Sequence, residues 1–258
     1  MRRLLLLALL LPALVACGDK ASGGKVTMDP PATGQCRELK RADLAKRSND
    51  SSPVACTEPH NAETFASGVL PEEFARTSYD DSSLDQWAYQ TCGTALREHL
   101  GINESTLMRT LLTWVWFRPS EEAWSAGARW YRCDLLAGGA GSRRYLDLPT
   151  TTKGLLAEGP PDDHWMTCAR GSDPEHGAKV PCSKQHAWRA VTTIKLGEPT
   201  DPYPGDDAVK QTSSDYCASS VQGWLGYPED YEYAYTWFGQ AEWQAGNRRS
   251  VCWAATSE

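Results

Sequence analysis

The sequence predicts an α+β protein built from two homologous small disulfide-stapled modules, each with one main helix packed on an antiparallel sheet. Three observations lead to this prediction. A pattern of four cysteines occurs twice in the chain. Each copy contains one stretch with apolar residues at helical spacing, and each contains stretches in which aromatic or other large apolar residues alternate with a period of two. A helix and a sheet that bury one face against each other form an α+β module.

The eight cysteines after Cys17 form two sets with related spacing. They are Cys36, Cys56, Cys92 and Cys133, and then Cys168, Cys182, Cys217 and Cys252. The local sequence repeats as well, since the motif Trp124-x-x-Gly127-x-Arg129-x-x-x-Cys133 returns as Trp243-x-x-Gly246-x-Arg248-x-x-x-Cys252. We therefore predict two modules, residues 36–137 and 163–255. The residues between them, 138–162, are rich in Gly and Pro at both ends and are predicted to be a linker, with a short strand around residues 145–148.

One helix is predicted in each module. Apolar residues recur at helical spacing from Leu84 to Leu100, with capping residues such as Asp81 before them and Gly101 after them. The second copy is expected at residues 206–225, where Gly226 ends it.

Strands are predicted before and after each helix in the sequence. The residues are β-branched or aromatic, or alternate with a period of two. The predicted strands are residues 63–70, 112–117 and 129–133 in the first module and 188–196, 231–238 and 248–252 in the second. Residues 124–127 and 243–246 are predicted to be turns into the last strand.

Residues 1–16 are predicted to be a lipoprotein signal peptide. Two arginines precede an apolar run, Leu4 to Val15, that is shorter than the roughly 20 residues of a membrane-spanning helix. The end of the leader, Leu14-Val15-Ala16-Cys17, resembles a bacterial lipobox. This resemblance implies lipidation of Cys17 and anchoring on the outer face of the cytoplasmic membrane. The alternative is an ordinary secretory signal in which Cys17 has no role.

The mature chain is expected to begin with a tether and to be acidic. Residues 17–35 are rich in Gly, Ser and Pro and lack hydrophobic periodicity, which predicts a flexible, lipidated segment. The formal charge is −7, and it becomes −9 once the leader and its two arginines are removed. An acidic body disfavours nucleic acid and anionic headgroups, so we expect contact with the membrane through the lipid anchor and no nucleic-acid partner.

Cysteines of an exported chain are expected to form disulfides, here within each module. Four cysteines allow three pairings, and spacing alone does not choose among them. The pairing we favour ties the module ends together through the outer cysteines: Cys56–Cys92, Cys36–Cys133, Cys182–Cys217 and Cys168–Cys252. A metal site on Cys56 with His60, or on Cys182 with His186, is the alternative. We expect no metal and no cofactor, because zinc would need thiolates that an oxidising compartment removes.

Several of these features resemble one known family. The run Cys56-Thr-Glu-Pro-His60-Asn-Ala-Glu63, the cysteine at 92 and the motif that ends at Cys133 are similar to the septum-formation domain of secreted and membrane-attached proteins in high-GC Gram-positive bacteria. The second module is more divergent, with Gln185 in place of Pro59 and Arg189 in place of Glu63. The resemblance implies an extracytoplasmic envelope protein with two tandem copies of the domain. It carries no catalytic residues across.

Known catalytic signatures are missing from the sequence. It contains no Gly-x-Ser-x-Gly elbow, no His-Glu-x-x-His motif and no phosphate-binding P-loop, so we expect no enzymatic activity. The alternative is an envelope hydrolase in which His60 acts as a base beside Glu63 or a nearby carboxylate. We expect instead that His60 and His186 bond to the backbone near a disulfide turn.

The repeated arginines have two interpretations. Arg129 and Arg248 would bind an anionic ligand if they were open to solvent. We expect each to stack on the tryptophan of its own motif, Trp124 or Trp243, or to pair with a carboxylate.

An aromatic stripe is the sharpest ligand candidate. Four residues of the predicted strand 231–238 share one face: Tyr231, Tyr233, Tyr235 and Trp237. Trp114 and Trp116 occupy the matching places in the first module. If exposed, these rings would stack on sugars of the cell wall; if the helix covers them, they are core, and the interface between the modules becomes the next candidate. The sequence therefore favours a non-enzymatic scaffold that binds a cell-wall glycan or a division-site protein.

Overall fold

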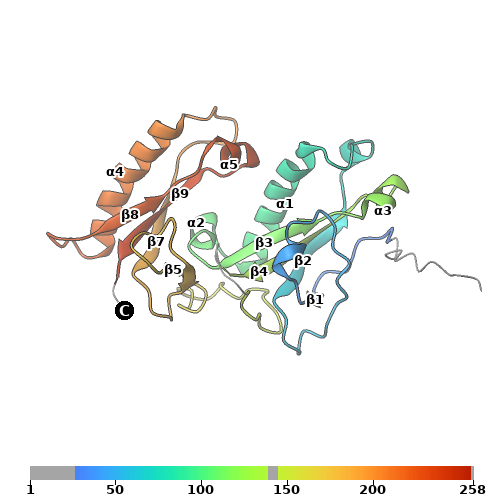
Figure 1. The fold of residues 1–258 in the computed structure, drawn as a ribbon, viewed down its shortest axis with the longest axis horizontal. Helices are drawn as coiled ribbons and strands as arrows, with labels where there is room; N and C mark the ends of the chain where they lie inside the picture. The colour runs from blue at the N-terminus through green and yellow to red at the C-terminus, as the bar shows by residue number, and fades with distance from the viewer. Residues whose placement is uncertain (1–26, 139–144, 257–258) are drawn as a thin grey trace, which may run out of the picture.

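The computed structural model describes residues 27–138 and 145–256, which form two lobes of the same architecture (Figure 1). Each lobe is an antiparallel sheet with one long helix against one face, as the predicted α+β class requires. The predicted signal peptide, Cys17 and the first part of the tether lie outside the described residues.

Module 1 contains a four-stranded sheet in the order β1-β2-β4-β3. Its strands are β1 (Cys36–Arg37), β2 (Ala62–Val69), β3 (Leu112–Phe117) and β4 (Trp130–Ala137). Its helices are α1 (Ser82–Leu100), α2 (Glu104–Leu107) and α3 (Glu121–Ser125), with 3-10 turns η1 (Arg41–Asp43) and η2 (Glu72–Phe74).

Module 2 contains a five-stranded sheet in the order β6-β5-β7-β9-β8. Its strands are β5 (Thr167–Ala169), β6 (Lys179–Pro181), β7 (Trp188–Lys195), β8 (Tyr233–Thr236) and β9 (Arg249–Ala255). Its helices are α4 (Asp206–Trp224) and α5 (Gln240–Ala245).

The two sheets share their order and their main irregularity. Strands β5, β7, β9 and β8 repeat the order β1, β2, β4 and β3, and β6 is added at one edge. The pairing of β2 with β4 shifts between Thr64 and Ala66, and that of β7 with β9 shifts between Ala190 and Thr192. A bulge of this kind leaves one extra residue in the strand. Here the extra residues are Phe65 and Val191, and both pack into the core beneath the helix of their own module.

Local sequence signals explain the helix ends. The Asp81 side chain accepts a hydrogen bond from the backbone N–H of Ser83 at 2.9 Å, and Gly101 ends α1 with φ at +77°. Both devices satisfy backbone groups that a helix end leaves unpaired. The predicted turns at 124–127 and 243–246 are the ends of two short helices, α3 and α5. Each is followed by a glycine in the left-handed region, Gly127 or Gly246.

Each module holds two disulfides, and all four stay within a module. They are Cys36–Cys56, Cys92–Cys133, Cys168–Cys182 and Cys217–Cys252. The predicted pairs Cys56–Cys92, Cys36–Cys133, Cys182–Cys217 and Cys168–Cys252 are therefore wrong. The cause is spatial, because the backbone of Cys36 pairs with Val54 and so brings the loop at Cys56 beside β1. The third and fourth cysteines of each module instead join its long helix to an inner strand of its sheet, α1 to β4 and α4 to β9.

The predicted linker packs on module 1. Leu146 pairs with Ala137 at the end of β4, in line with the short strand expected there. Leu148 and Leu156 are buried in the same core as α1. On the N-terminal side, the carbonyl of Thr27 accepts a hydrogen bond from Trp130 Nε1 at 2.9 Å. The described part of the predicted tether therefore also lies against module 1.

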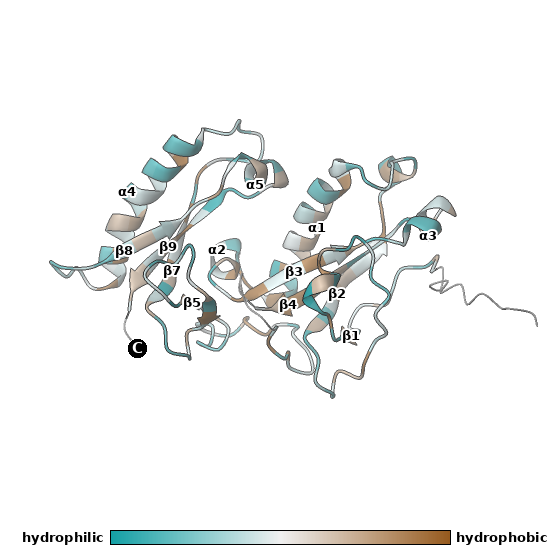
Figure 2. Cartoon of the chain, in the orientation of Figure 1, coloured by the Kyte–Doolittle hydropathy of each residue, from teal (hydrophilic) through white to brown (hydrophobic). Residues whose placement is uncertain are grey.

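The modules stack in alternating layers of helix and sheet (Figure 1). From one end these layers are α4, the sheet of module 2, α1 with α2, and the sheet of module 1. Met108, directly after α2, packs against a cluster on the helix-free face of the module 2 sheet that includes Trp188, Val251 and Trp253. In Figure 2 the hydrophobic residues gather in strands such as β3, whereas both long helices carry hydrophilic turns. The space between these layers is where a ligand site is expected.

Candidate ligand site between the modules

Backbone pairing holds the modules together. The N–H of Leu111 donates to the carbonyl of Trp165, and the N–H of Thr167 donates to the carbonyl of Arg109, both at 2.8 Å. These bonds join the residues that precede β3 to the residues that enter β5. They anchor the start of module 2 directly on module 1.

Side chains from α2 and its surroundings complete the junction. Glu104 forms an ion pair with Arg249 of β9, with 2.7 Å between Oε2 and Nε. The hydroxyl of Thr193 in β7 donates to the hydroxyl of Ser105 at 2.8 Å. Arg109 donates to the carbonyl of Val191 at 3.1 Å. The helix α2 therefore bonds to the sheet of module 2 by several polar contacts that no sequence motif had marked.

A cleft of about 710 Å³ lies beside this junction. One wall comes from α1, including Tyr89 and Arg97, and the facing wall comes from β8 and β9, including Trp253. Thr113 and Trp114 of β3 border it as well. The volume is in the range of small-molecule sites. Both modules must be present to form this cleft.

Aromatic and cationic groups line the cleft together. The rings of Tyr89 and Trp114 meet edge to face with centroids 5.9 Å apart. On the other side, the ammonium of Lys179 lies 5.5 Å from the centroid of the Trp253 ring. Burial raises the pKa of Tyr89 and lowers the pKa of Lys179, because each charged form is less hydrated there. Trp253 is buried and Lys179 donates to backbone carbonyls, so the rings open to a ligand are the half-buried ones of Tyr89 and Trp114.

The predicted aromatic stripe lies beneath α4. Tyr231, Tyr233 and Tyr235 are half-buried against the core that contains Cys217 and Val221 of α4. The Tyr231 hydroxyl donates to the carbonyl of Ala218 at 3.0 Å. This face is therefore covered by the helix, as the core alternative expected, and does not form an open sugar-binding surface.

The other predicted aromatic residues have structural partners too. Trp237 lies under the ammonium of Lys210, 4.2 Å from the ring centroid. The guanidinium of Arg118 lies 4.1 Å from the centroid of Trp116. Of the six aromatic candidates, Trp114 alone lines the cleft.

His60 and His186 have the backbone role that the sequence indicated. Each ring bonds through Nδ1 to the carbonyl two residues earlier, Glu58 at 2.8 Å and Lys184 at 2.7 Å. His60 is only 2% exposed. A base that acts on a substrate must reach it, and this ring has no such access. The geometry therefore gives no support to a hydrolase that uses His60.

Glu63 does not bond to His60, with which the hydrolase alternative paired it. Its Oε2 accepts hydrogen bonds from the backbone N–H and the hydroxyl of Thr152, both at 2.7 Å. His99 of α1 bonds to the same hydroxyl at 2.9 Å. Burial lowers the pKa of His99, and the nearby Glu63 counteracts part of that effect. This buried contact ties the segment after module 1 to both α1 and β2, and neither His99 nor Thr152 belongs to a recognisable motif.

The repeated arginines stack on the tryptophans of their own motifs. The guanidinium of Arg129 lies 4.0 Å from the ring centroid of Trp124, and that of Arg248 lies 3.7 Å from Trp243. Both also donate to backbone carbonyls, including that of the stacked tryptophan. These contacts confirm the stacking interpretation for both arginines. The Arg248 guanidinium bonds to backbone carbonyls through all three of its nitrogens.

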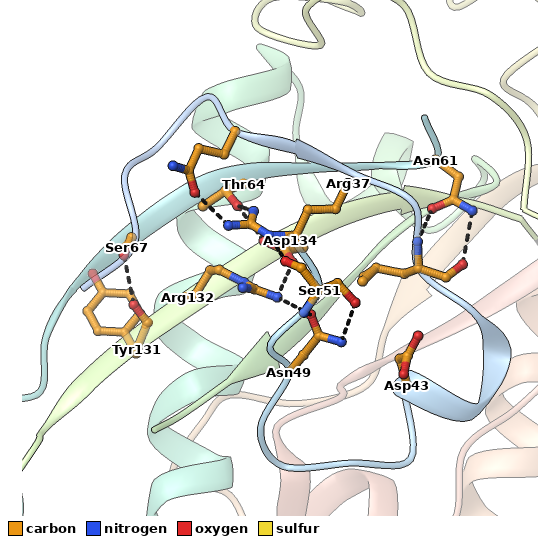
Figure 3. A network of polar contacts seen from close by, with 12 residues as sticks. Arg37, Asp43, Asn49, Ser51, Asn61, Thr64, Ser67, Tyr131, Arg132 and Asp134 are labelled. Carbon is orange, nitrogen blue, oxygen red and sulfur yellow. Dashed lines mark hydrogen bonds and ion pairs between the residues drawn. The ribbon is translucent and has the colours of Figure 1, made fainter. Parts of the chain in front are cut away.

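A buried charge network covers the outer face of the module 1 sheet (Figure 3). Asp134 of β4 is fully buried, accepts a hydrogen bond from the hydroxyl of Thr64 at 2.6 Å and pairs with Arg132 at 3.0 Å. Arg37 of β1 donates to the same Thr64 hydroxyl at 2.7 Å. Burial and the neighbouring Arg132 lower the pKa of Arg37 to about 10, while Asp134 raises it. Arg132 also donates to Asn49, so the network holds the loop after β1 on the sheet.

The second module carries apolar residues at the matching positions. Counted from the last cysteine of each module, Arg132 corresponds to Val251 and Asp134 to Trp253. In module 1 this face lies under its own loop, whereas in module 2 it packs against Met108 of module 1 and borders the cleft. The corresponding sheet face is thus charged in module 1 and packs against the other module in module 2.

Two kinds of feature are absent from the described residues. No group of three or more His, Cys, Asp or Glu side chains there is arranged to hold a metal ion. None of the helices in residues 27–138 and 145–256 combines the length and the apolar character needed to cross a membrane.

The fold and the cleft define a class of protein: a disulfide-bonded pair of α+β modules with a ligand-sized space at their junction. A family model described as septum formation matches residues 33–252, and the chain belongs to this septum-formation family. The match runs once across both modules, so the two tandem family copies inferred from the resemblance stay a prediction. No curated protein and no solved structure matches the chain.

Proposed function

We propose that this protein is a lipid-anchored, non-enzymatic binding protein of the cell envelope that acts at the division septum and holds a cell-wall glycan in the cleft between its modules. The family supports a septum-related role. The four disulfides are typical of a protein outside the reducing cytoplasm.

The observation that carries the proposal is the cleft itself. Sugar rings stack on aromatic faces and bond to polar groups through their hydroxyls, and the cleft offers both. The half-buried rings of Tyr89 and Trp114 come from module 1 beside Arg97, and Lys179 and Thr236 line the cleft from module 2. A glycan bound there would contact both halves of the protein.

Blocking the cleft should abolish glycan binding. Thr113 is exposed on β3 and lines the cleft, so Thr113→Trp places a bulky ring at the β3 edge of the cleft without removing a packed side chain. We expect its affinity for soluble glycan fragments from digested sacculi, measured by calorimetry, to fall at least about tenfold.

The control is Val69→Trp, which places the same ring on an exposed strand residue away from the cleft. It should bind like the wild type. Equal binding by Thr113→Trp and the wild type would place the site elsewhere. If the oxidised wild-type protein bound neither soluble fragments nor intact sacculi, the proposed function would be wrong.

The lipid anchor has a separate test. Cys17 lies in the lipobox-like run and is the only cysteine outside the two modules. We expect the wild-type protein to partition into the detergent phase of a cell extract and Cys17→Ala to remain in the aqueous phase, because dual acylation is what holds such a protein on a bilayer. Equal partition of the two proteins would contradict the anchor.

A further inference from the structure

The end of α4 presents an exposed tyrosine in an unfavourable backbone conformation. Tyr227 has φ at +62°, and it is the single non-glycine residue with positive φ in the described residues. Side chains with a Cβ rarely adopt this conformation. Tyr227 is nevertheless 76% exposed, so packing of its ring does not account for it. An outlier of this kind at the surface points to a function for the side chain.

A helix-ending motif includes Tyr227 but does not require its positive φ, since Ile102 of module 1 makes the same N–H bond to a carbonyl five residues earlier without one. The N–H of Tyr227 donates to the carbonyl of Gln222 at 2.8 Å, and the N–H of Gly226 donates to that of Gly223 at 3.2 Å. These two bonds are the Schellman motif that ends many helices. The Tyr227 ring lies against Gly223. The next residue, Trp224, is the last residue of α4 and is 49% exposed.

Module 1 shows what occupies the same place. Leu100, Gly101 and Ile102 correspond to Leu225, Gly226 and Tyr227, and Ile102 is partly buried in the module 1 core. Residues 148–157 cover that helix end. Within them, the N–H of Gly154 donates to the carbonyl of His99 and that of Leu156 to the carbonyl of Leu100.

This internal copy defines the kind of segment that fits. Residues 148–157 contain no strand or helix of their own, bond through their backbone and bury Leu148 and Leu156. Their sequence is LPTTTKGLLA. In the described part of module 2 no segment covers the matching end, and two aromatic rings stand there instead.

Charge distinguishes the second helix end from the first. Three exposed carboxylates, Glu229, Asp230 and Glu232, follow Tyr227. None of the nine ion pairs found among the described residues includes them. Aromatic faces beside carboxylates attract lysine and arginine side chains.

We propose that the end of α4, formed by Trp224, Tyr227 and these three carboxylates, docks an extended, lysine- or arginine-bearing segment of a partner protein. The segment lies across the helix end as residues 148–157 do in module 1, and its cations face the carboxylates. This surface is separate from the cleft, and the proposal stands without the proposed glycan binding.

The test uses two peptides based on the internal copy. One has the sequence of residues 148–157 with its threonines replaced by lysine, and the other has glutamate in the same places. Calorimetry on the oxidised protein should show binding of the lysine peptide, at least about tenfold tighter than the glutamate peptide and weakened by added salt. Equal affinity for the two peptides, or no binding of either, would overturn the proposal.

Variants then locate the site. Tyr227→Asn removes the ring and suits the left-handed conformation, so its melting temperature should not fall below that of the wild type. Its affinity for the lysine peptide should fall at least about tenfold. Val69→Asn, which changes another exposed apolar residue, and Thr113→Trp, which places a ring at the β3 edge of the cleft, should bind the peptide normally.

Two further outcomes would refute the docking surface. If Tyr227→Asn bound the peptide like the wild type, the peptide site would lie elsewhere. If Tyr227→Asn lost binding of neutral chitin fragments while the wild type ignored the lysine peptide, the surface would be a carbohydrate site. Loss of glycan binding in Thr113→Trp alone tests the proposed glycan site in the cleft and has no bearing on the proposed docking surface at the end of α4.

Discussion

Replacing Cys92 and Cys133 together with alanine should lower the free energy of unfolding by about 4 kcal/mol, the chain-entropy value for a loop of this length. The two residues are 41 positions apart and both are fully buried, one on α1 and the other in β4. The bond therefore joins the helix to the sheet at the centre of the module 1 core. Chemical denaturation followed by circular dichroism measures the loss.

The matched control is the double replacement of Cys36 and Cys56. Their separation is 20 positions and Cys56 is only half-buried, so the expected loss is smaller, about 3 kcal/mol. As the concentration of reductant is raised, the Cys36–Cys56 disulfide should also be reduced before the buried Cys92–Cys133 disulfide. A larger loss from Cys36 and Cys56 than from Cys92 and Cys133 would show that the core disulfide is not the main covalent support of the module.

Replacing Asp134 with alanine is expected to cost about 3–5 kcal/mol, as for other buried charges that lose their partner. The network holds one carboxylate between two guanidinium groups, those of Arg37 and Arg132. Without Asp134, two buried cations would face each other and the Thr64 hydroxyl would lose its acceptor. Denaturant unfolding of the purified variant gives the value.

The asymmetry of the network supplies the control. Arg132→Met leaves one cation and one anion, so its cost should be clearly smaller than that of Asp134→Ala. The double variant Asp134→Leu with Arg132→Val gives this face the apolar character that Val251 and Trp253 provide in module 2. Its loss of free energy of unfolding should be smaller than that of Asp134→Ala alone. If Arg132→Met were the more damaging change, unbalanced buried charge would not explain the stability of this face.

Local signals allowed the main elements to be predicted. The capping carboxylate of Asp81 and the glycine after Leu100 place both ends of α1 within a few residues, because each acts on the backbone next to it. The alternation from Leu112 to Phe117 matches β3. The arginine of each repeated motif lies five residues after the tryptophan it stacks on, and this contact was also predictable because both residues belong to one short turn.

The errors concern contacts between segments that are distant in the chain. Four cysteines at similar spacing do not reveal that Val54 lies beside Cys36, and that contact selects the disulfide partner. The aromatic strand was ambiguous for the same reason, since alternation gives the shared face of Tyr231, Tyr233 and Tyr235 but not the element that covers it. His99 and Thr152 are 53 positions apart and follow no pattern, so their shared hydroxyl contact was not foreseen.

Short stretches of sequence were enough to specify the two α+β modules, their long helices and most of their strands, because those features follow from periodicity and capping within a few turns of chain. The disulfide partners, the burial of the aromatic stripe and the cleft beside α2 emerged only from the folded chain. Each of these depends on which surfaces meet after folding. The sequence is compatible with a loop of module 2 over Val251 and Trp253, whereas in the folded chain Met108 of module 1 packs against them.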